Sequence, residues 1–285
     1  MLGAFGSPAD MVTADSDFDI PRRIVLYADE STPALKAEEV GRFLTQILGI
    51  TAETKGDFIT ILGHGDMEEI ARRLAGVRVH DVSKAFERQE ASYGEMMFEL
   101  RFLEDPAKKV PGVLYDGWVM QRLLRDMLPP KKRTSRFQHI VFTSRLIGTF
   151  EPDGRYHAHV NLCGFPSIVS TSGVVEAPAK PREYYLLKRR FVEAGEDVPF
   201  ELLKERFAGQ FIDYDDPRMT EVMKGYALQC ALYLITKEAF CDKRGCRLFD
   251  AHWQSEVIEA QLDGKLCIRH EKIVKEIRQK AEKTR

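Results

Sequence analysis

Four potential metal ligands near the C-terminus constrain the fold of this chain more than any other feature. Cys241 and Cys246 are spaced C-x4-C, and Cys267 and His270 follow as C-x2-H after a connection of twenty residues. Short-spaced pairs separated by a longer connection are typical of tetrahedral zinc sites, and Cys3His is an ordinary structural ligand set. We therefore expect these residues to bind about one structural zinc ion per chain. His252, between the two pairs, could replace His270 at the metal.

The segment before the first of these cysteines predicts a buried helix. Residues 219–240 contain no Pro and one Gly, and apolar residues cover most of the helix circumference. A helix of this kind is packed on nearly all sides. It would lead directly into Cys241.

The rest of the chain alternates between strand-like and helix-like patterns. Predicted strands lie at residues 24–29, 58–63, 95–103, 139–144, 156–164 and 167–172. Predicted helices lie at residues 36–49, 67–76, 115–128, 182–195, 200–209, 219–240, 251–262 and 270–283. This alternation predicts an α/β (α+β) fold, with a mixed sheet flanked by helices.

Composition and charge narrow the function classes. With 285 residues, of which 44% are hydrophobic, the chain can fill a sizeable core. A net charge of −2 gives no drive toward nucleic acid or an anionic membrane, and we interpret the basic run 131–136 as a solvated loop. No apolar stretch is long enough to span a membrane, and acids stand where a signal peptide has basic residues. We expect a cytoplasmic protein without a membrane or nucleic-acid partner.

Two cysteines lie outside the candidate zinc site. Cys163 and Cys230 lie in apolar surroundings, and we interpret them as small buried hydrophobic residues.

The composition along the chain predicts three portions. Residues 1–19 are expected to form a disordered tail, residues 20–112 an N-terminal α/β portion, and residues 113–285 a portion that contains the zinc site. No linker divides the last two into independent domains.

Several short segments, taken in order, resemble those of the archaemetzincins, a family of zinc metallopeptidases with a structural zinc beside the catalytic one. They are YDGWVMQ from residue 115, HIVFTSRLIG from residue 139, SIVSTS from residue 167, CDKRGCRLF from residue 241 and CIRH from residue 267. The resemblance covers residues 115–270 and is strongest at the C-x4-C segment. It implies a metzincin-like core.

The chain departs from that family at the catalytic helix. The family motif H-E-x-x-H-x-x-G-x-x-H places its three His on Cys230, Leu234 and Phe240, and its Glu on Ala231. Hydrocarbon side chains have no lone pair for zinc, so the family mechanism is not carried here. The resemblance then implies a non-catalytic relative that binds a peptide or protein partner without cutting it. We expect Leu234 and Phe240 to be buried against the sheet.

An alternative is a metal-dependent hydrolase with a relocated site. His157 and His159 share one side of a predicted strand, because side chains repeat every second residue, and Glu176 or Glu183 could supply a third ligand. The simpler interpretation, which we favour, is two ordinary strand histidines that face solvent or a polar groove.

Overall fold

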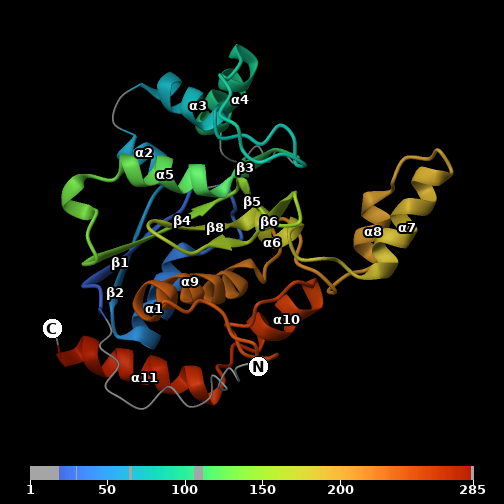
Figure 1. The fold of residues 1–285 in the computed structure, drawn as a ribbon. Coiled ribbons are helices and arrows are strands. Elements are labelled where there is room, and N and C mark those ends of the chain that lie inside the picture. The colour runs from blue at the N-terminus through green and yellow to red at the C-terminus, as the bar shows by residue number, and fades with distance from the viewer. Residues whose placement is uncertain (1–18, 30, 64–65, 106–111, 284–285) are drawn as a thin grey trace, which may run out of the picture.

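The computed structural model describes residues 19–29, 31–63, 66–105, 112–283 of the chain. Nearly all of the expected N-terminal tail, residues 1–18, lies outside the described residues. Two sheets with helices on their faces make up the body, and α7 and α8 form an arm that projects from it (Figure 1). The expected α/β fold with a mixed sheet flanked by helices is therefore confirmed.

The larger sheet has five strands in the order β2-β1-β4-β8-β7. The first four run parallel, and β7 is antiparallel to β8. The smaller sheet has the order β3-β5-β6, with β3 parallel and β6 antiparallel to β5. The strands are β1 (Arg23–Tyr27), β2 (Thr51–Lys55), β3 (Leu114–Asp116), β4 (Phe137–Thr143), β5 (Leu146–Phe150), β6 (Tyr156–His159), β7 (Asn161–Leu162) and β8 (Ser167–Ser170).

Helices lie on both faces of the larger sheet, with α1 and α9 on one face and α2 and α5 on the other (Figure 1). The α-helices are α1 (Ala37–Leu48), α2 (Phe58–Leu62), α3 (Met67–Ala75), α4 (Tyr93–Glu104), α5 (Gly117–Met127), α6 (Thr171–Glu176), α7 (Arg182–Glu193), α8 (Phe200–Arg206), α9 (Met219–Thr236), α10 (Gln254–Leu262) and α11 (Ile268–Lys283). A 3-10 turn at Pro130–Lys132 follows α5. None of the described helices is both long enough and apolar enough to cross a membrane.

Successive residues of β1 point to opposite faces of the sheet and enter two separate cores. Ile24 and Leu26 pack with α1, α9 and α11, whereas Val25 and Tyr27 pack with α2, α3 and α5. A fully buried side chain of this size contributes about 1.5–3 kcal/mol to folding. Cover on both faces explains why β1, inside the sheet, is a nearly continuous apolar run.

Two segments that we expected to be strands are helices. Of residues 58–63, the first five form α2, because the Asp57 side chain accepts the Thr60 N–H and caps the helix. Residues 95–103 belong to α4, whose start is a capping box between Ser92 and Glu95. In both segments a capping side chain favours helix over strand, whereas the periodicity of a short apolar run does not distinguish the two.

The expected burial of α9 is confirmed, but its end differs from the prediction. Cys230 and Ala231 are fully buried, whereas Leu234 is half-buried and Phe240 is 45% exposed. The expectation that Leu234 and Phe240 pack against the sheet was therefore wrong. The helix ends at Thr236 because Lys237 adopts a left-handed conformation, with φ 66°, so Phe240 lies in the following loop.

Strands from both predicted portions of the chain share the larger sheet. β1 and β2 come from residues 20–112, and β4 pairs directly with β1 although it comes from residues 113–285. The division into these two portions stays a prediction.

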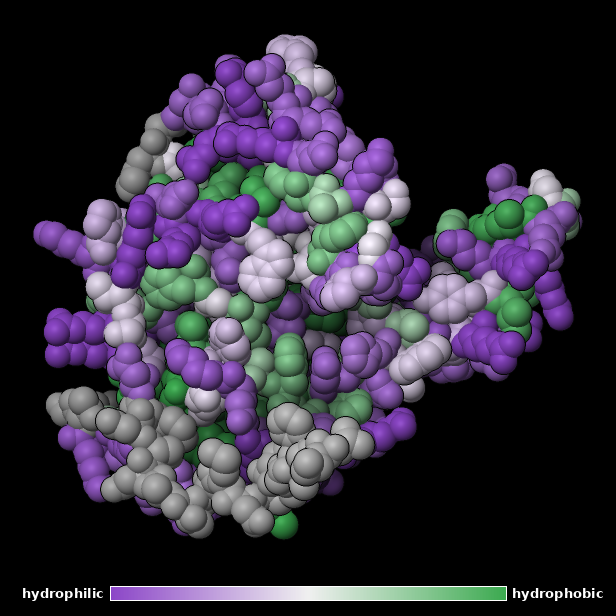
Figure 2. All heavy atoms as spheres, in the orientation of Figure 1, coloured by the Kyte–Doolittle hydropathy of each residue, from purple (hydrophilic) through white to green (hydrophobic). Residues whose placement is uncertain are grey.

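The projecting arm carries apolar side chains on its surface, which appear green in Figure 2. The exposed large apolar residues of α7 and α8 are Tyr185, Leu186, Val192, Phe200 and Leu202.

Candidate metal centre

The loop after α9 brings the first two cysteines together. Cys241 is fixed by its N–H, which donates to Leu248 O at 2.7 Å, and Cys246 by its N–H, which donates to Lys243 O at 3.0 Å. Gly245 closes the turn between them with φ 81°, a conformation that glycine adopts at no steric cost. The C-x4-C spacing is thus one turn that points both sulfurs to the same side.

The other two candidate ligands stand at the start of α11. Cys267 precedes the helix directly, and His270 lies in its first turn. Residues three apart on a helix face the same direction, so the C-x2-H spacing presents both side chains to the loop after α9.

The four ligand atoms lie within 4.8 Å of one another. The Sγ atoms of Cys241 and Cys267 are 3.8 Å apart, and His270 Nδ1 lies 3.7 Å from Cys246 Sγ and 3.2 Å from Cys267 Sγ. Zn–S bonds of about 2.3 Å and Zn–N bonds of about 2.0 Å in a tetrahedron place two sulfurs about 3.8 Å apart and sulfur and nitrogen about 3.5 Å apart. The residues therefore fit zinc in both chemistry and spacing.

Backbone amides support two of the sulfurs. The Lys243 N–H donates to Cys241 Sγ at 3.3 Å, and the Cys267 N–H donates to Cys246 Sγ at 3.4 Å. Hydrogen bonds to the charged form of a ligand favour that form and fix its orientation, as outer contacts of metal sites do. These two hydrogen bonds favour the thiolates of Cys241 and Cys246, the metal-binding form of cysteine, and so act against the effect of burial.

Burial changes the proton affinity of these side chains. It raises the pKa of Cys241 to about 12 and also raises the pKa of Cys246. Burial also acts to raise the pKa of Cys267, but hydrogen bonds from the His270 and Arg269 amides and the other two thiols hold it below its usual value. Desolvation lowers the pKa of His270, so its imidazole is held neutral and able to coordinate. A divalent cation would offset the cost of ionising the buried thiols.

The structure brings His270, and not His252, to the three cysteines. The His252 side chain is 78% exposed and lies 3.6 Å from an Asp250 carboxylate oxygen. Its backbone N–H donates to Glu256 at the start of α10.

The two strand histidines each have a local partner. His157 Nε2 lies 2.8 Å from Asp153 Oδ2, and His159 Nε2 lies 2.7 Å from Thr149 Oγ1. Both side chains are more than one-third exposed, as expected for histidines on a strand that faces a polar surface.

Neither proposed acid joins these histidines in a metal-binding group. Glu176 accepts a hydrogen bond from Tyr214 at 3.0 Å, and Glu183 is exposed in the first turn of α7. Across the residues that the structure describes, the one group of three or more His, Cys, Asp or Glu residues suited to a metal is the Cys3His cluster. A catalytic role of His157, His159, Glu176 or Glu183 stays an untested prediction.

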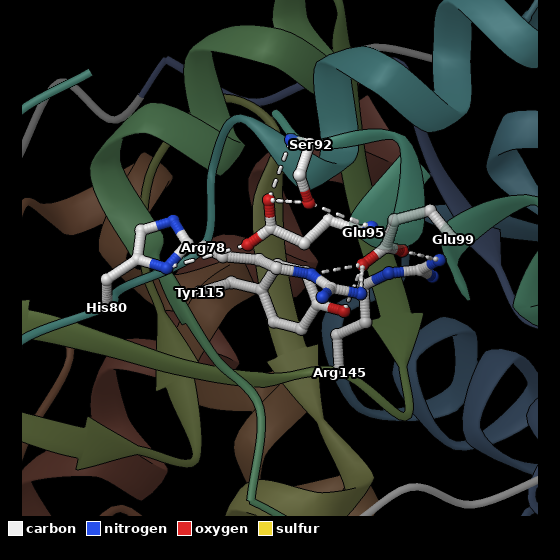
Figure 3. Close-up of polar contacts among 7 residues, drawn as sticks. All are labelled: Arg78, His80, Ser92, Glu95, Glu99, Tyr115 and Arg145. Atoms are coloured by element: carbon white, nitrogen blue, oxygen red, sulfur yellow. Dashed lines mark hydrogen bonds and ion pairs between the residues drawn. The ribbon is translucent and has the colours of Figure 1, made fainter. Parts of the chain in front are cut away.

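A buried ion-pair cluster was not expected from the sequence. The Glu99 carboxylate from α4 is fully buried between Arg78 and Arg145, and Tyr115 from β3 donates a hydrogen bond to it (Figure 3). The signal in the sequence was the capping sequence from Ser92 to Glu95, which places Glu99 one turn further along the same helix.

Comparison with known proteins gives the family of the chain. Among curated proteins no match is found. Among solved structures, the zinc-dependent peptidase from Methanocorpusculum labreanum is similar with a TM-score of 0.40 and 12% identity, over 88% of this chain and 98% of that one. A likeness at that TM-score supports no conclusion about this chain. A family model described as "Probable metallopeptidase family (DUF6775)" matches residues 20–277, and the chain belongs to this family.

Proposed function

We propose that this protein is a non-catalytic, zinc-binding relative of the archaemetzincins, in which Cys241, Cys246, Cys267 and His270 hold one structural zinc ion. The observation that carries the proposal is the Cys3His group itself, whose ligand atoms all lie within 4.8 Å of one another, three of the separations at 3.2–3.8 Å. Zinc bound there would be closed to substrate, because four protein ligands leave no open position for water.

The course of α9 supports the archaemetzincin alignment. When the family motif is laid onto the helix, its Gly falls on Lys237, and Lys237 has the left-handed conformation that favours glycine, with φ 66°. The chain then leads through Phe240 to Cys241, as the family order requires. The backbone turn is kept although the residues that bind the catalytic metal have changed.

The surroundings of α9 support the loss of peptidase activity. At the first motif positions, Cys230 and Ala231 are fully buried. The Cys230 sulfur lies 3.7 Å from Asn161 Nδ2 and 3.8 Å from the Cys163 sulfur, so it is packed against β7 and the loop after it. A buried thiol beside a methyl group has neither the imidazoles nor the carboxylate that a zinc-bound water needs.

Without peptidase activity, the protein would act by binding a protein or peptide partner in the cytoplasm. Cysteines that serve as metal ligands rather than as disulfides are typical of a reducing compartment, which supports a cytoplasmic location. Large apolar side chains left exposed on the α7–α8 arm support a protein or peptide partner, because burying them against another molecule is favourable.

Metal analysis of the purified protein tests the zinc assignment. We expect about one zinc per chain, lost in Cys246→Ser and kept in the matched control Cys163→Ser, whose thiol lies outside the cluster. About two zinc ions per chain would instead point to a second, relocated site.

A peptide library read by mass spectrometry tests the absence of catalysis. The zinc-loaded protein should leave the library uncut. Chelator-sensitive cleavage that disappears in His157→Ala or His159→Ala would replace the non-catalytic proposal with the relocated site. Cleavage lost in Cys230→Ala would show that the alignment of α9 is wrong.

A further inference from the structure

The α7–α8 arm contains a helix that the rest of the protein leaves largely uncovered. None of the twelve residues of α7 is buried, although six of them are apolar or aromatic. A helix of this length is only marginally stable alone in water, and helices in proteins depend on the packing of their apolar side chains. The described residues therefore supply only part of the packing that α7 can use.

One side of α7 is packed inside the arm. The Tyr184 ring lies 5.7 Å, between centroids, from each of the Phe207 and Phe211 rings. Leu187 contacts the same small core, which also contains Leu203 of α8. Residues three apart share a side of a helix, so Tyr184 and Leu187 mark the inner side of α7.

The other side of α7 is apolar and exposed. Tyr185, Leu186 and Val192 are 46%, 47% and 60% exposed. Tyr185 and Val192 are seven residues apart, about two helical turns, so they share this outer side. Leu202 of α8 is 49% exposed as well. The arm projects away from the body, so a second molecule can reach it (Figure 1).

The charges of the arm are balanced in number but separated along the chain. Residues 188–190 are three basic residues in a row, whereas residues 193–201 include four acidic residues and no basic one. From residue 182 to residue 206, six basic residues face six acidic ones. Among the residues that the structure describes, Arg190, Glu196 and Asp197 are exposed and form no ion pair.

We propose that the outer side of α7 binds a second copy of this chain, so that two arms pack into one intermolecular helical bundle. This inference names the partner of the arm and so rests on the binding role proposed above. Under a two-fold axis every contact occurs twice, with the two residues exchanged between the copies. Residues 188–190 of each copy then lie against residues 193–201 of the other. Val192, between the two charged segments, lies near the axis.

The pattern of charge favours a second copy over a partner of uniform charge. A strongly acidic or strongly basic partner would meet like charge on one part of the arm, which disfavours binding. Two copies related by a two-fold axis pair opposite charges at both contacts. The arm also has no net charge that would keep two copies apart.

Sedimentation velocity of the zinc-loaded full chain over a range of concentrations tests the pairing. We expect a monomer–dimer equilibrium for the wild type. Val192→Glu should weaken the dimer at least about 10-fold, equivalent to about 1.4 kcal/mol, because it places two acids near the axis. The matched control is Val82→Glu, since Val82 is 55% exposed outside the arm, and this variant should dimerise as the wild type does. Circular dichroism checks that both variants are folded.

Exchanged charges identify the second copy directly. Arg190→Glu in one variant, and Glu196→Arg with Asp197→Arg in another, should each weaken the homodimer, because like charges then face each other across the axis. Mixed in equal amounts, the two variants should form a heterodimer about as stable as the wild-type dimer. Both contacts of that heterodimer again pair opposite charges.

Each alternative outcome overturns the pairing. These outcomes are a monomer at every concentration, a dimer that Val192→Glu leaves unchanged or that Val82→Glu weakens equally, and charge variants that do not associate when mixed. Zinc content and peptide cleavage are measured separately, so a failure here is distinguishable from a failure of the zinc-binding or non-catalytic assignment.

Discussion

Replacing Glu99 by Gln tests the buried ion-pair cluster that joins α4 to the rest of the protein. Three donors meet Glu99 Oε1: Arg78 Nε at 2.9 Å, Arg78 Nη2 at 2.7 Å and the Tyr115 hydroxyl at 2.6 Å. Arg145 Nη2 donates to Oε2 at 3.0 Å. Gln keeps the size of the side chain, but it removes the charge and turns an N–H₂ group toward one set of donors.

The loss of stability in Glu99→Gln depends on how little water reaches the two guanidinium groups. The side chains of Arg78 and Arg145 are 11% and 5% exposed, and that of Glu99 is fully buried, so solvent screening is weak. Removing one partner from a buried ion pair costs about 3–5 kcal/mol, since it leaves an uncompensated charge. We therefore expect Glu99→Gln to lower the free energy of unfolding by about that amount.

Urea unfolding at neutral pH, followed by circular dichroism, measures the effect. Glu95→Gln is the matched control, because Glu95 lies on the same helix and, among the described residues, its carboxylate bonds Ser92 in the capping box and contacts His80 near the surface. Gln can still accept the hydrogen bond from the Ser92 N–H, so the capping box is kept and the change should cost no more than about 0.5 kcal/mol. A loss in Glu99→Gln no larger than in Glu95→Gln would refute the claim that a buried, charge-dependent network holds α4.

Three further predictions concern the metal centre, acid stability and the end of α9. Cys241→Ser or Cys246→Ser should lower the melting temperature of the zinc-loaded protein far more than Cys163→Ser, because each removes a ligand; equal shifts in a thermal melt would contradict this. His139 accepts the Tyr27 hydroxyl and lies near Lys132 O, and burial lowers its pKa to about 4. Since the folded pKa lies below the ordinary value of about 6.5, the stability from neutral His139 is complete above pH 6.5 and is lost as pH falls toward 4, about 2 kcal/mol by pH 5. His139→Gln should remove this part of the pH profile in urea titrations, and a profile parallel to wild type would exclude it. Lys237→Gly should raise the free energy of unfolding by about 0.5–1 kcal/mol, because glycine adopts the left-handed conformation without strain; a decrease would mean that the Lys237 Nζ hydrogen bond to Leu234 O matters more.

Local spacing predicted that the four candidate ligands come together, because they lie on two short segments whose geometry is set by their own sequence. C-x4-C forms one turn and C-x2-H one helical turn. The structure brings both pairs together, with His270 rather than His252 as the fourth residue. The long helices were predictable for the same reason, since amphipathic or fully apolar periodicity extends over several turns.

Features that depend on residues distant in the sequence were not predicted. β2 is a partly exposed edge strand of polar composition, TAETK, and only its pairing with β1 makes it a strand. The pairing of Glu99 with Arg145 joins residues 46 apart through tertiary packing. The exposure of Phe240 depends on the positive φ angle of Lys237, which the pattern of side chains in the sequence does not predict.

The placement of the metal centre has a consequence for the unfolded chain as well as for the fold. Ligands at residues 241 and 270 would make a bound metal a cross-link that closes a loop of about 30 residues, worth about 3.5 kcal/mol of chain entropy by the usual polymer estimate. That loop ends at α11, whose apolar residues share one core with α1 and α9. Chelation should therefore lower the stability of the whole helical layer on that face of the sheet, and unfolding of α1 and α11 should respond to the metal together.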